Sequence, residues 1–437
     1  MKNHWKQITV LSLTVLLLAA LCACAIGAGT DAGSTDAQTL QQSADGSAAT
    51  KKTETAQSGE SASVTNVANV SSGGAIDASE LFRKRELTQT AELSEAVTCT
   101  VSDGNDINIT QAGVYVLQGS AKNVTVFVEA GDEDKVQLVL DGLSVTNDDF
   151  PVIYVKNADK VIVTTTEGSE NSLSVTGSFV ADGSTNTDAV IFSRDDLVFN
   201  GLGSLSISST DNGISGKDDI KLTGGVLTVS AQCHGIEAND SIAVCGGTVT
   251  VSAGKDGLHA ENEDDDSEGW IYLCGGTLDI TATDDGVHAV SIVQIDGGVL
   301  SVNAAEGIEG TWVQLNDGAV TIQARDDGIN GARMSTAYTT CIELNGGTLT
   351  VSMGQGDTDA IDSNGNLVIT GGVINITAQS PFDYDGSLTH TGGTITVNGV
   401  ETDEITNQFG GGFGGGNGGF GGSPGGNGGH GGGGWHG

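Results

Sequence analysis

The sequence predicts an all-β protein that folds as a right-handed, single-stranded parallel β-helix with three short strands in each coil. A Gly-Gly pair followed by an alternating apolar run recurs from Gly224-Gly225 to Gly392-Gly393, and Asp317-Gly318 fills the one gap. The second glycines of successive pairs are 20 to 29 residues apart. Between the pairs lies a second motif of a polar residue, glycine and an aliphatic residue, as in Asp285-Gly286-Val287. Three strands in about 21 residues suit a β-helix, whereas a β-propeller blade needs four strands and about 40 residues.

A single repeat is too small to bury its own apolar face, so the repeats must stack and share one interior. Val, Ile and Leu at alternate positions then point inward, and glycines occupy corners that need a positive φ or a close backbone approach. Looser repeats between residues 96 and 210 are expected to form the first coils. We expect a segment near Leu81 to Leu93 to cap the open end.

The N-terminus has the composition of an export signal. Within residues 1–24, two lysines precede an apolar run from Ile8 to Leu21 that is too short for a stable membrane span. Cys24 follows a small residue and resembles the lipidated cysteine of bacterial lipoproteins, with an ordinary secretory signal as the alternative. We therefore expect the protein on the extracellular face of the cell membrane, lipid-anchored or secreted.

The domain boundaries follow from composition. Residues 25–75 are rich in Ser, Thr, Ala and Gly, which predicts a flexible, disordered N-terminal linker. Residues 401–437 are expected to be a Gly-rich disordered tail, since 19 of the last 28 residues are glycine. The β-helix therefore occupies residues 76–400.

The charge balance narrows the class of partner. The chain has 17 Lys and Arg against 56 Asp and Glu, a formal net charge of −39. Nucleic acids and anionic membrane surfaces bind cationic proteins, so no nucleic acid is expected, and membrane contact only through the lipid anchor. Cations and polysaccharides remain as partners, and a monomer is expected.

Stacking turns repeated acidic residues into a column, because equivalent residues of successive coils lie about 4.8 Å apart. From Asp256 to Ala324 there are 14 Asp or Glu and no Lys or Arg. Stacked carboxylates without counter-charge favour Ca²⁺, which prefers hard oxygen ligands. Capping of turns by the same side chains is the alternative. The predicted Ca²⁺ ligands are Asp256, Asp284, Asp285, Glu306, Glu309, Asp326, Asp327, Asp359 and Asp362.

The scarce aromatic residues suggest a sugar-binding surface. Trp270 and Trp312 lie at matched positions two coils apart, about 9.6 Å, which is comparable with the repeat of a β-1,4-linked disaccharide. With Tyr272 and the outward-facing His259 and His288, they are the predicted carbohydrate contacts. The alternative is that both tryptophans cover a corner of the core.

Several segments together carry a resemblance to a known family. They are Asp141–Asn147, Ile153–Val161, Gly168–Leu173, Phe192–Leu197 and the repeated Asp-Gly-Ile and Gly-Gly-Thr-Leu-Thr-Val units. Over about residues 80–400, the chain resembles the clostridial carbohydrate-binding β-helix proteins, which bind cellulose and acidic plant sugars and are fold relatives of pectate lyases. It departs from their pattern at Gln232-Cys233-His234, where the acidic pair is missing, and at Ala319.

The resemblance implies bound Ca²⁺, an extracellular location and polysaccharide binding without demonstrated cleavage. We therefore expect Ca²⁺-dependent binding of cellulose or an acidic plant or wall polysaccharide, without catalytic residues. One alternative is a Ca²⁺-dependent pectate or uronate lyase, for which Lys255, Arg325 and Arg333 are the nearest candidate bases. A structural surface adhesin is the other.

Overall fold

The computed structural model describes residues 38–39, 75–355 and 358–407. The chain divides into two units, Met1–Asp36 and Ala37–Gly437, and all described residues belong to the second. The predicted export signal with Cys24, most of the predicted linker and most of the tail lie outside the described residues. Among the described residues, no helix combines the length and apolar character needed to span a bilayer.

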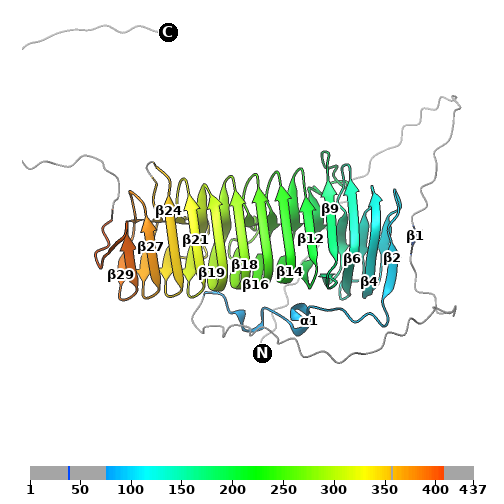
Figure 1. Cartoon of the computed structure of the whole chain (residues 1–437), viewed down its shortest axis with the longest axis horizontal. Coiled ribbons are helices and arrows are strands. Elements are labelled where there is room, and N and C mark those ends of the chain that lie inside the picture. The colour runs from blue at the N-terminus through cyan, green and yellow to red at the C-terminus, as the bar shows by residue number, and fades with distance from the viewer. Residues whose placement is uncertain (1–37, 40–74, 356–357, 408–437) are drawn as a thin grey trace, which may run out of the picture. The chain divides into compact units, whose positions relative to one another are not determined.

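The described residues form a parallel β-helix, which confirms the predicted fold class (Figure 1). Each strand pairs in parallel with its counterpart one coil later, and the terminal pair β30–β31 is antiparallel. Several strands continue through corners, so the strands join one hydrogen-bonded sheet that folds into three faces.

The first face carries the second motif of each repeat. Its strands are β3 (Ile107–Ile109), β5 (Val126–Glu129), β7 (Ile153–Asn157), β10 (Ala189–Ser193), β13 (Asn212–Gly216), β15 (Ile236–Ala238), β17 (Leu258–Ala260), the starts of β19 (Asp285–Ala304) and β20 (Glu306–Leu315), β22 (Ile329–Gly331), β25 (Ile361–Ser363) and β28 (Asp383–Tyr384). Strand β1 (Gln38–Thr39), within the predicted linker, pairs in parallel with β3.

The second face follows along the chain. Its strands are β2 (Val97–Thr100), the starts of β4 (Gly113–Lys122) and β6 (Lys135–Asn147), β8 (Lys160–Thr165), β11 (Asp196–Gly201), the starts of β14 (Asp219–Ala231), β16 (Ser241–Ala253) and β18 (Trp270–Ala282), the middle of β19, the end of β20, β23 (Cys341–Leu344), β26 (Asn366–Ile369) and β29 (Leu388–His390).

The third face completes each coil. It contains the ends of β4, β6, β14, β16, β18 and β19, together with β9 (Glu170–Val175), β12 (Ser204–Ser208), β21 (Ala319–Ala324), β24 (Thr348–Met353), β27 (Val373–Thr377), β30 (Thr394–Val397) and β31 (Val400–Glu401).

Inward-pointing aliphatic side chains from the three faces form one continuous core. On the first face, Val287, Ile308 and Ile329 occupy the same position in successive coils and are at most 1% exposed. Burying one such side chain contributes about 1.5–3 kcal/mol. Because every coil adds its own layer, the stack supplies the apolar cover that a single repeat lacks.

The two glycine motifs meet different steric demands. Gly298, in a Gly-Gly pair, has φ +88°, a conformation that side chains with a Cβ rarely adopt. A Cβ on Gly286, in the second motif, would lie 2.2 Å from Val302 Cγ1 and 2.7 Å from the carbonyl oxygen of Gly307. The Gly-Gly corner therefore needs a positive φ and the other corner a close approach, as the sequence predicts.

Residues 75–89, which we name the N-terminal strap, contain helices η1 (Ala78–Glu80) and α1 (Lys84–Leu87). The strap runs along the outside of the second face, where Figure 1 shows it in blue. Its first residue, Ala75, donates its N–H to Gln314 Oε1 at 2.8 Å, and the Gln89 side chain donates to the Thr223 carbonyl at 3.0 Å. The expectation that this part of the chain caps an open end is therefore wrong.

The strap is fixed by a buried charge as well as by apolar contacts. Glu86 is 1% exposed and forms an ion pair with Lys160, whose Nζ also lies 3.1 Å from Asp196 Oδ2. Burial raises the pKa of Glu86, but the Arg83 N–H and the Lys160 and Lys221 charges outweigh it and leave the pKa below its usual value. Ile76, Leu81 and Phe82 pack over Tyr272 and Ala243.

We predict that Glu86→Gln loosens the strap and lowers the free energy of opening it by about 2–4 kcal/mol, because the substitution leaves Lys160 with less counter-charge in a buried position. Hydrogen exchange of residues 75–89 measures this opening. The exposed Glu80, which is ion-paired with Arg83 on the same strap, is the matched control. Glu80→Gln should change the free energy of opening the strap by less than about 0.5 kcal/mol. Equal effects of the two substitutions would contradict the role given to Glu86.

Candidate metal and carbohydrate site on the first face

The outward column predicted from the sequence is present on the first face. Strand registers place its members side by side in successive coils. In chain order they are Ser215, Glu237, His259, His288, Glu309, Asn330, Asp362 and Asp383. Register also extends the column back through Phe192, Tyr154 and Phe127. This aromatic part is not among the predicted features, although the alternation Ile153-Tyr154-Val155 indicates an outward aromatic residue.

A second row of polar side chains lies beside the column, at the position before each corner glycine. Its members are Asn212, His234, Asp256, Asp285, Glu306 and Asp327, followed by Asp359, where Ala360 replaces the glycine. Both rows together, from Asn212 to Asp362, are named the polar strip. Asp256 Oδ1 accepts the Asp285 N–H at 3.0 Å, and Asp327 Oδ1 accepts the Asp359 N–H at 3.1 Å. These two hydrogen bonds join each carboxylate to the next coil and leave one oxygen of each carboxylate without a backbone partner among them.

His288 lies between two carboxylates of the strip. Its Nδ1 lies 2.9 Å from Asp285 Oδ2 and 2.8 Å from Glu309 Oε2. Burial would lower the pKa of His288, but hydrogen bonds to these two carboxylates outweigh it and raise the pKa to about 10. The absence of Lys and Arg therefore does not leave the strip without a protein cation.

Beyond His288 the strip contains only oxygen-bearing acidic and amide side chains. Glu306 and Glu309 lie close enough to Asp285 that one oxygen from each falls within 4.8 Å of the others. Asn330 Nδ2 donates to Glu306 Oε2 at 2.9 Å and to Glu309 Oε1 at 3.2 Å. Its own Oδ1 is buried and has no hydrogen-bond partner.

The crowded acids titrate above their usual range. Burial is the first cause for Glu306, Asp327 and Asp362, and the charges of neighbouring carboxylates add to it. Their pKa values are raised to about 8, about 6 and about 7, respectively. A charged state of all three together is therefore costly without a bound cation.

The predicted Ca²⁺ ligands do not all lie in the strip. Asp284 and Asp326 are exposed at the corner, one residue before the second row, and face solvent. Asp359 and Asp362 lie in the last coils of the strip, where Ser380 Oγ donates to Asp359 Oδ1. The structure thus brings together Asp256, Asp285, Glu306, Glu309, Asp327, Asp359 and Asp362, and excludes Asp284 and Asp326.

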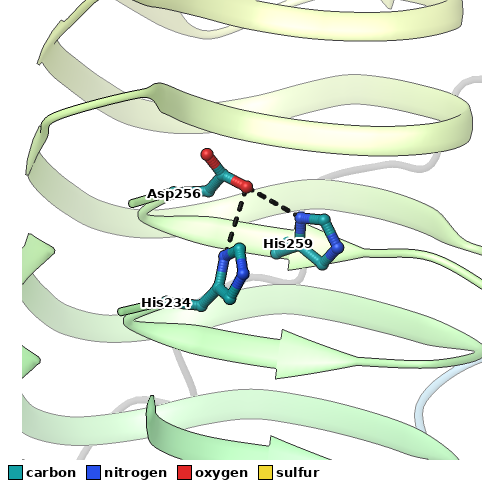
Figure 2. Close-up of side chains that lie close together, drawn as sticks. All are labelled: His234, Asp256 and His259. Carbon is teal, nitrogen blue, oxygen red and sulfur yellow. Dashed lines mark hydrogen bonds and ion pairs between the residues drawn. The ribbon is translucent and has the colours of Figure 1, made fainter. Parts of the chain in front are cut away.

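At the other end of the strip, two imidazoles face one carboxylate (Figure 2). Asp256 Oδ2 lies 2.8 Å from His259 Nδ1 and 3.2 Å from His234 Nδ1. Burial raises the pKa of Asp256, but the two imidazoles and the Asp285 N–H outweigh it and hold the pKa well below its usual range. His259 and His288 stack at 4.8 Å between ring centroids and 11° between planes. Both histidines, predicted as sugar contacts, therefore contact carboxylates of the strip.

The predicted tryptophan surface needs a correction. Register aligns Trp270, Ile292 and Trp312 in successive coils, as expected. Tyr272, however, is fully buried beneath the strap, and its hydroxyl donates to Asp296 Oδ2 at 3.0 Å. Tyr272 therefore has no face open to a sugar. Trp270 packs against the same cluster and its Nε1 donates to Glu268 at 3.0 Å, which matches the alternative of core cover.

The two repeats of 29 residues, which end at Gly276 and Gly347, contain additional residues at 261–269 and 331–340. These residues form loops that contact each other. Thr336 donates its N–H and hydroxyl to Asp266 Oδ2, each at 2.7 Å, and Tyr338 donates its hydroxyl to the Ser267 carbonyl at 3.1 Å. The Tyr338 ring lies 6.3 Å from that of Trp312. These loops join the coils of β18 and β23 at the corner between the first and second faces.

The comparisons with known proteins agree with this geometry at the level of family. The family described as carbohydrate-binding domain-containing protein matches residues 103–355 and 304–408. The chain therefore belongs to the family of carbohydrate-binding domain-containing proteins. A relative with the same description from Acetivibrio thermocellus is 34% identical over 123 residues, 28% of this chain. The match spans 43% of the length of that relative.

A solved structure is also similar. It is described as the polysaccharide lyase-like protein from C. thermocellum, in a gadolinium derivative. The similarity has a TM-score of 0.45 and 28% identity, and covers 52% of this chain and 93% of that chain.

We predict that His288 stays protonated at pH 8 in the metal-free protein. Its folded pKa lies above the unfolded value of about 6.5, so its stabilising effect is complete below about pH 6.5 and is lost as the pH rises towards 10. NMR titration of the ring measures this directly. His288→Gln should remove about 3 kcal/mol of local stability at pH 7, with Asp285, Glu309 and Asp256 facing the new side chain. A neutral ring at pH 8 would rule out the internal cation.

Proposed function

We propose that the protein binds an acidic polysaccharide outside the cell through Ca²⁺ held on the first face, and that it does not cleave the polymer. The observation that carries this proposal is the group formed by Glu306, Glu309 and Asn330. Two carboxylates are held together by one amide, whose own oxygen is buried without a partner. Membership of the carbohydrate-binding family supplies the class of ligand.

The donor set of this group fits Ca²⁺. Ca²⁺ binds six to eight oxygens from carboxylates, amide carbonyls and water, and accepts irregular geometry. Glu306, Glu309 and Asn330 offer such oxygens, with Asp285 beside them. A divalent cation here would offset the repulsion between stacked carboxylates, and rotation of the Asn330 amide would turn its buried, unpartnered Oδ1 towards that cation.

An acidic polymer follows from the charge of the strip. Without cations, a row of carboxylates repels uronates, whereas Ca²⁺ with free coordination positions can bridge a protein carboxylate and a sugar carboxylate. The Glu309 side chain is 15% exposed, so its outer edge is open to solvent. The column runs from coil to coil along the stack, which suits an extended polymer.

Two of the three candidate bases for a lyase, Arg325 and Arg333, are held by other protein groups, which supports binding without cleavage. The third, Lys255, is exposed at the corner before Asp256. Eliminative cleavage of a uronate needs a base beside the sugar carbon that loses its proton. Arg325 donates to the Thr283 carbonyl at 2.8 Å, and Arg333 donates to the Asn364 carbonyl at 2.7 Å and pairs with Asp385 at 3.0 Å. Protein groups thus already hold both guanidinium groups.

We predict that the full chain binds polygalacturonate with Ca²⁺ present and loses that binding on chelation. Calorimetry with wild type and Glu309→Gln measures the contribution of the oxygen group. Because the substitution removes one charged oxygen ligand, it should weaken Ca²⁺ binding by about tenfold or more. Asp284→Asn is the matched control, since Asp284 is an exposed acid of the preceding coil that lies outside the strip, and this variant should bind like wild type.

Three results would contradict the proposal. Equal binding with and without chelator would remove the role of Ca²⁺. Release of unsaturated uronate products would indicate a lyase. Ca²⁺-independent binding of cellulose in place of polygalacturonate would instead favour the surface around Trp270 and Trp312.

A further inference from the structure

We propose that His234, Asp256 and His259 form a separate metal site, for Zn²⁺ or a similar divalent transition-metal ion. The site lies on the same first face as the oxygen group but in earlier coils. It does not depend on the proposed Ca²⁺ function. His234 precedes β15, Asp256 precedes β17 and His259 lies within β17.

The three side chains converge as metal ligands do. One donor atom from each lies within 4.8 Å of the other two. The contacts of Asp256 Oδ2 with the two Nδ1 atoms measure 2.8 Å and 3.2 Å. Ligand atoms bound to one Zn²⁺ at about 2.0–2.1 Å are separated by roughly 3.3 Å in a tetrahedral shell. A bound ion therefore needs only small side-chain shifts.

His234 provides an observation that points to a missing ligand. Its Nδ1 is buried and makes no hydrogen bond. Asp256 Oδ2 lies 3.2 Å from this nitrogen, but the two groups do not have the geometry of a hydrogen bond. Burying a polar nitrogen without a partner costs free energy. A metal ion between the imidazoles and the carboxylate would satisfy this atom.

His259 is oriented as zinc-binding histidines often are. Its Nε2 lies 3.4 Å from Glu261 Oε2, while its Nδ1 faces Asp256. In the metal-free protein His259 Nδ1 and Asp256 Oδ2 share a hydrogen bond. A bound cation would take the place of the proton between them, with the remaining ring proton on Nε2 directed at Glu261. Carboxylates in this outer position orient the imidazole and increase its basicity towards a metal.

The backbone fixes the remaining ligands before any metal binds. Asp256 Oδ1 accepts the Asp285 N–H, so Oδ2 is the oxygen left for the histidines. The His234 N–H donates to Asn212 Oδ1 at 2.9 Å. Both ligands are therefore anchored to neighbouring coils. The His234 side chain is only 14% exposed and the Asp256 side chain only 7%.

A repeated motif shows why the site forms here and not one coil later. Asp256-Gly257-Leu258-His259 and Asp285-Gly286-Val287-His288 share the pattern Asp-Gly-aliphatic-His. In the first motif, Asp256 contacts the imidazole of His234. In the second motif, His288 contacts the carboxylate of Glu309. His288 consequently pairs with two acids as a cation, and its charge separates the nitrogen-containing site from the oxygen group.

The donor types select the class of ion. Imidazole nitrogens suit Zn²⁺, Ni²⁺ and Cu²⁺, whereas Ca²⁺ takes oxygen ligands. Two imidazoles and one carboxylate leave at least one coordination position for water or an oxygen of a bound molecule.

Zinc calorimetry on the full, chelator-treated chain tests this proposal, with excess Ca²⁺ present to occupy oxygen-only sites. We expect one Zn²⁺ to bind per chain at this site, and Co²⁺ in its place to give a visible spectrum typical of nitrogen ligation. His234→Gln and His259→Gln should each weaken Zn²⁺ binding by at least about tenfold, because each removes one of three protein ligands. An unchanged far-ultraviolet circular dichroism spectrum shows that both variants fold, whatever the outcome for polygalacturonate binding.

Controls exclude binding by other histidines. His390→Gln, on the second face in β29, should leave Zn²⁺ affinity unchanged. His430→Gln with His436→Gln, in the Gly-rich tail, identifies any additional ion bound there. Unchanged Zn²⁺ affinity and Co²⁺ spectrum in both His234→Gln and His259→Gln would overturn the proposal. Absence of Zn²⁺ binding to wild type at neutral pH would do so as well.

Discussion

Hydrogen bonding between successive coils holds each residue beside its counterpart in the next coil, and the rest of the structure depends on this register. Inside the helix, the register stacks aliphatic side chains such as Val287, Ile308 and Ile329 into one core. Outside, the same register forces like polar residues into contact. The corner before each first-face strand adds to the constraint, because a Cβ on Gly286 would collide with Val302 and the next coil. The backbone at these corners therefore cannot shift to increase the distance between neighbouring polar side chains.

The polar strip relieves the resulting repulsion in several ways along its length. Backbone N–H groups bind one oxygen of Asp256 and of Asp327. An amide, Asn330, bridges Glu306 and Glu309, and the imidazole of His288, which is 15% exposed, contacts two acids. These groups divide the strip into a nitrogen-containing part and an oxygen-only part. The two proposed metal sites follow from this division, because the ligand type at each position decides which ion binds.

The sequence predicts features that depend on period and fails on features that depend on distant contacts. The spacing of the glycines and the alternation of apolar and polar residues predict the three-strand coil and the outward column from Ser215 to Asp362. Both features follow from the register of successive coils. The strap was misplaced because its position rests on bonds such as Ala75 to Gln314, which no local pattern indicates. The sequence pattern therefore predicts an exposed Tyr272, whereas the strap buries this residue. The charge of His288 depends on Glu309 in the next coil, and the loop contact of Thr336 with Asp266 joins residues three coils apart.

Carbohydrate binding by this fold would then depend on cations placed by the coil register. An anomalous difference map from crystals grown with Ca²⁺ tests that claim most directly. The account predicts a peak about 2.3–2.6 Å from oxygens of Glu306, Glu309 and Asn330. A map with Ca²⁺ bound only at the exposed acids of the loop around Asp264, and none between these three side chains, would contradict it.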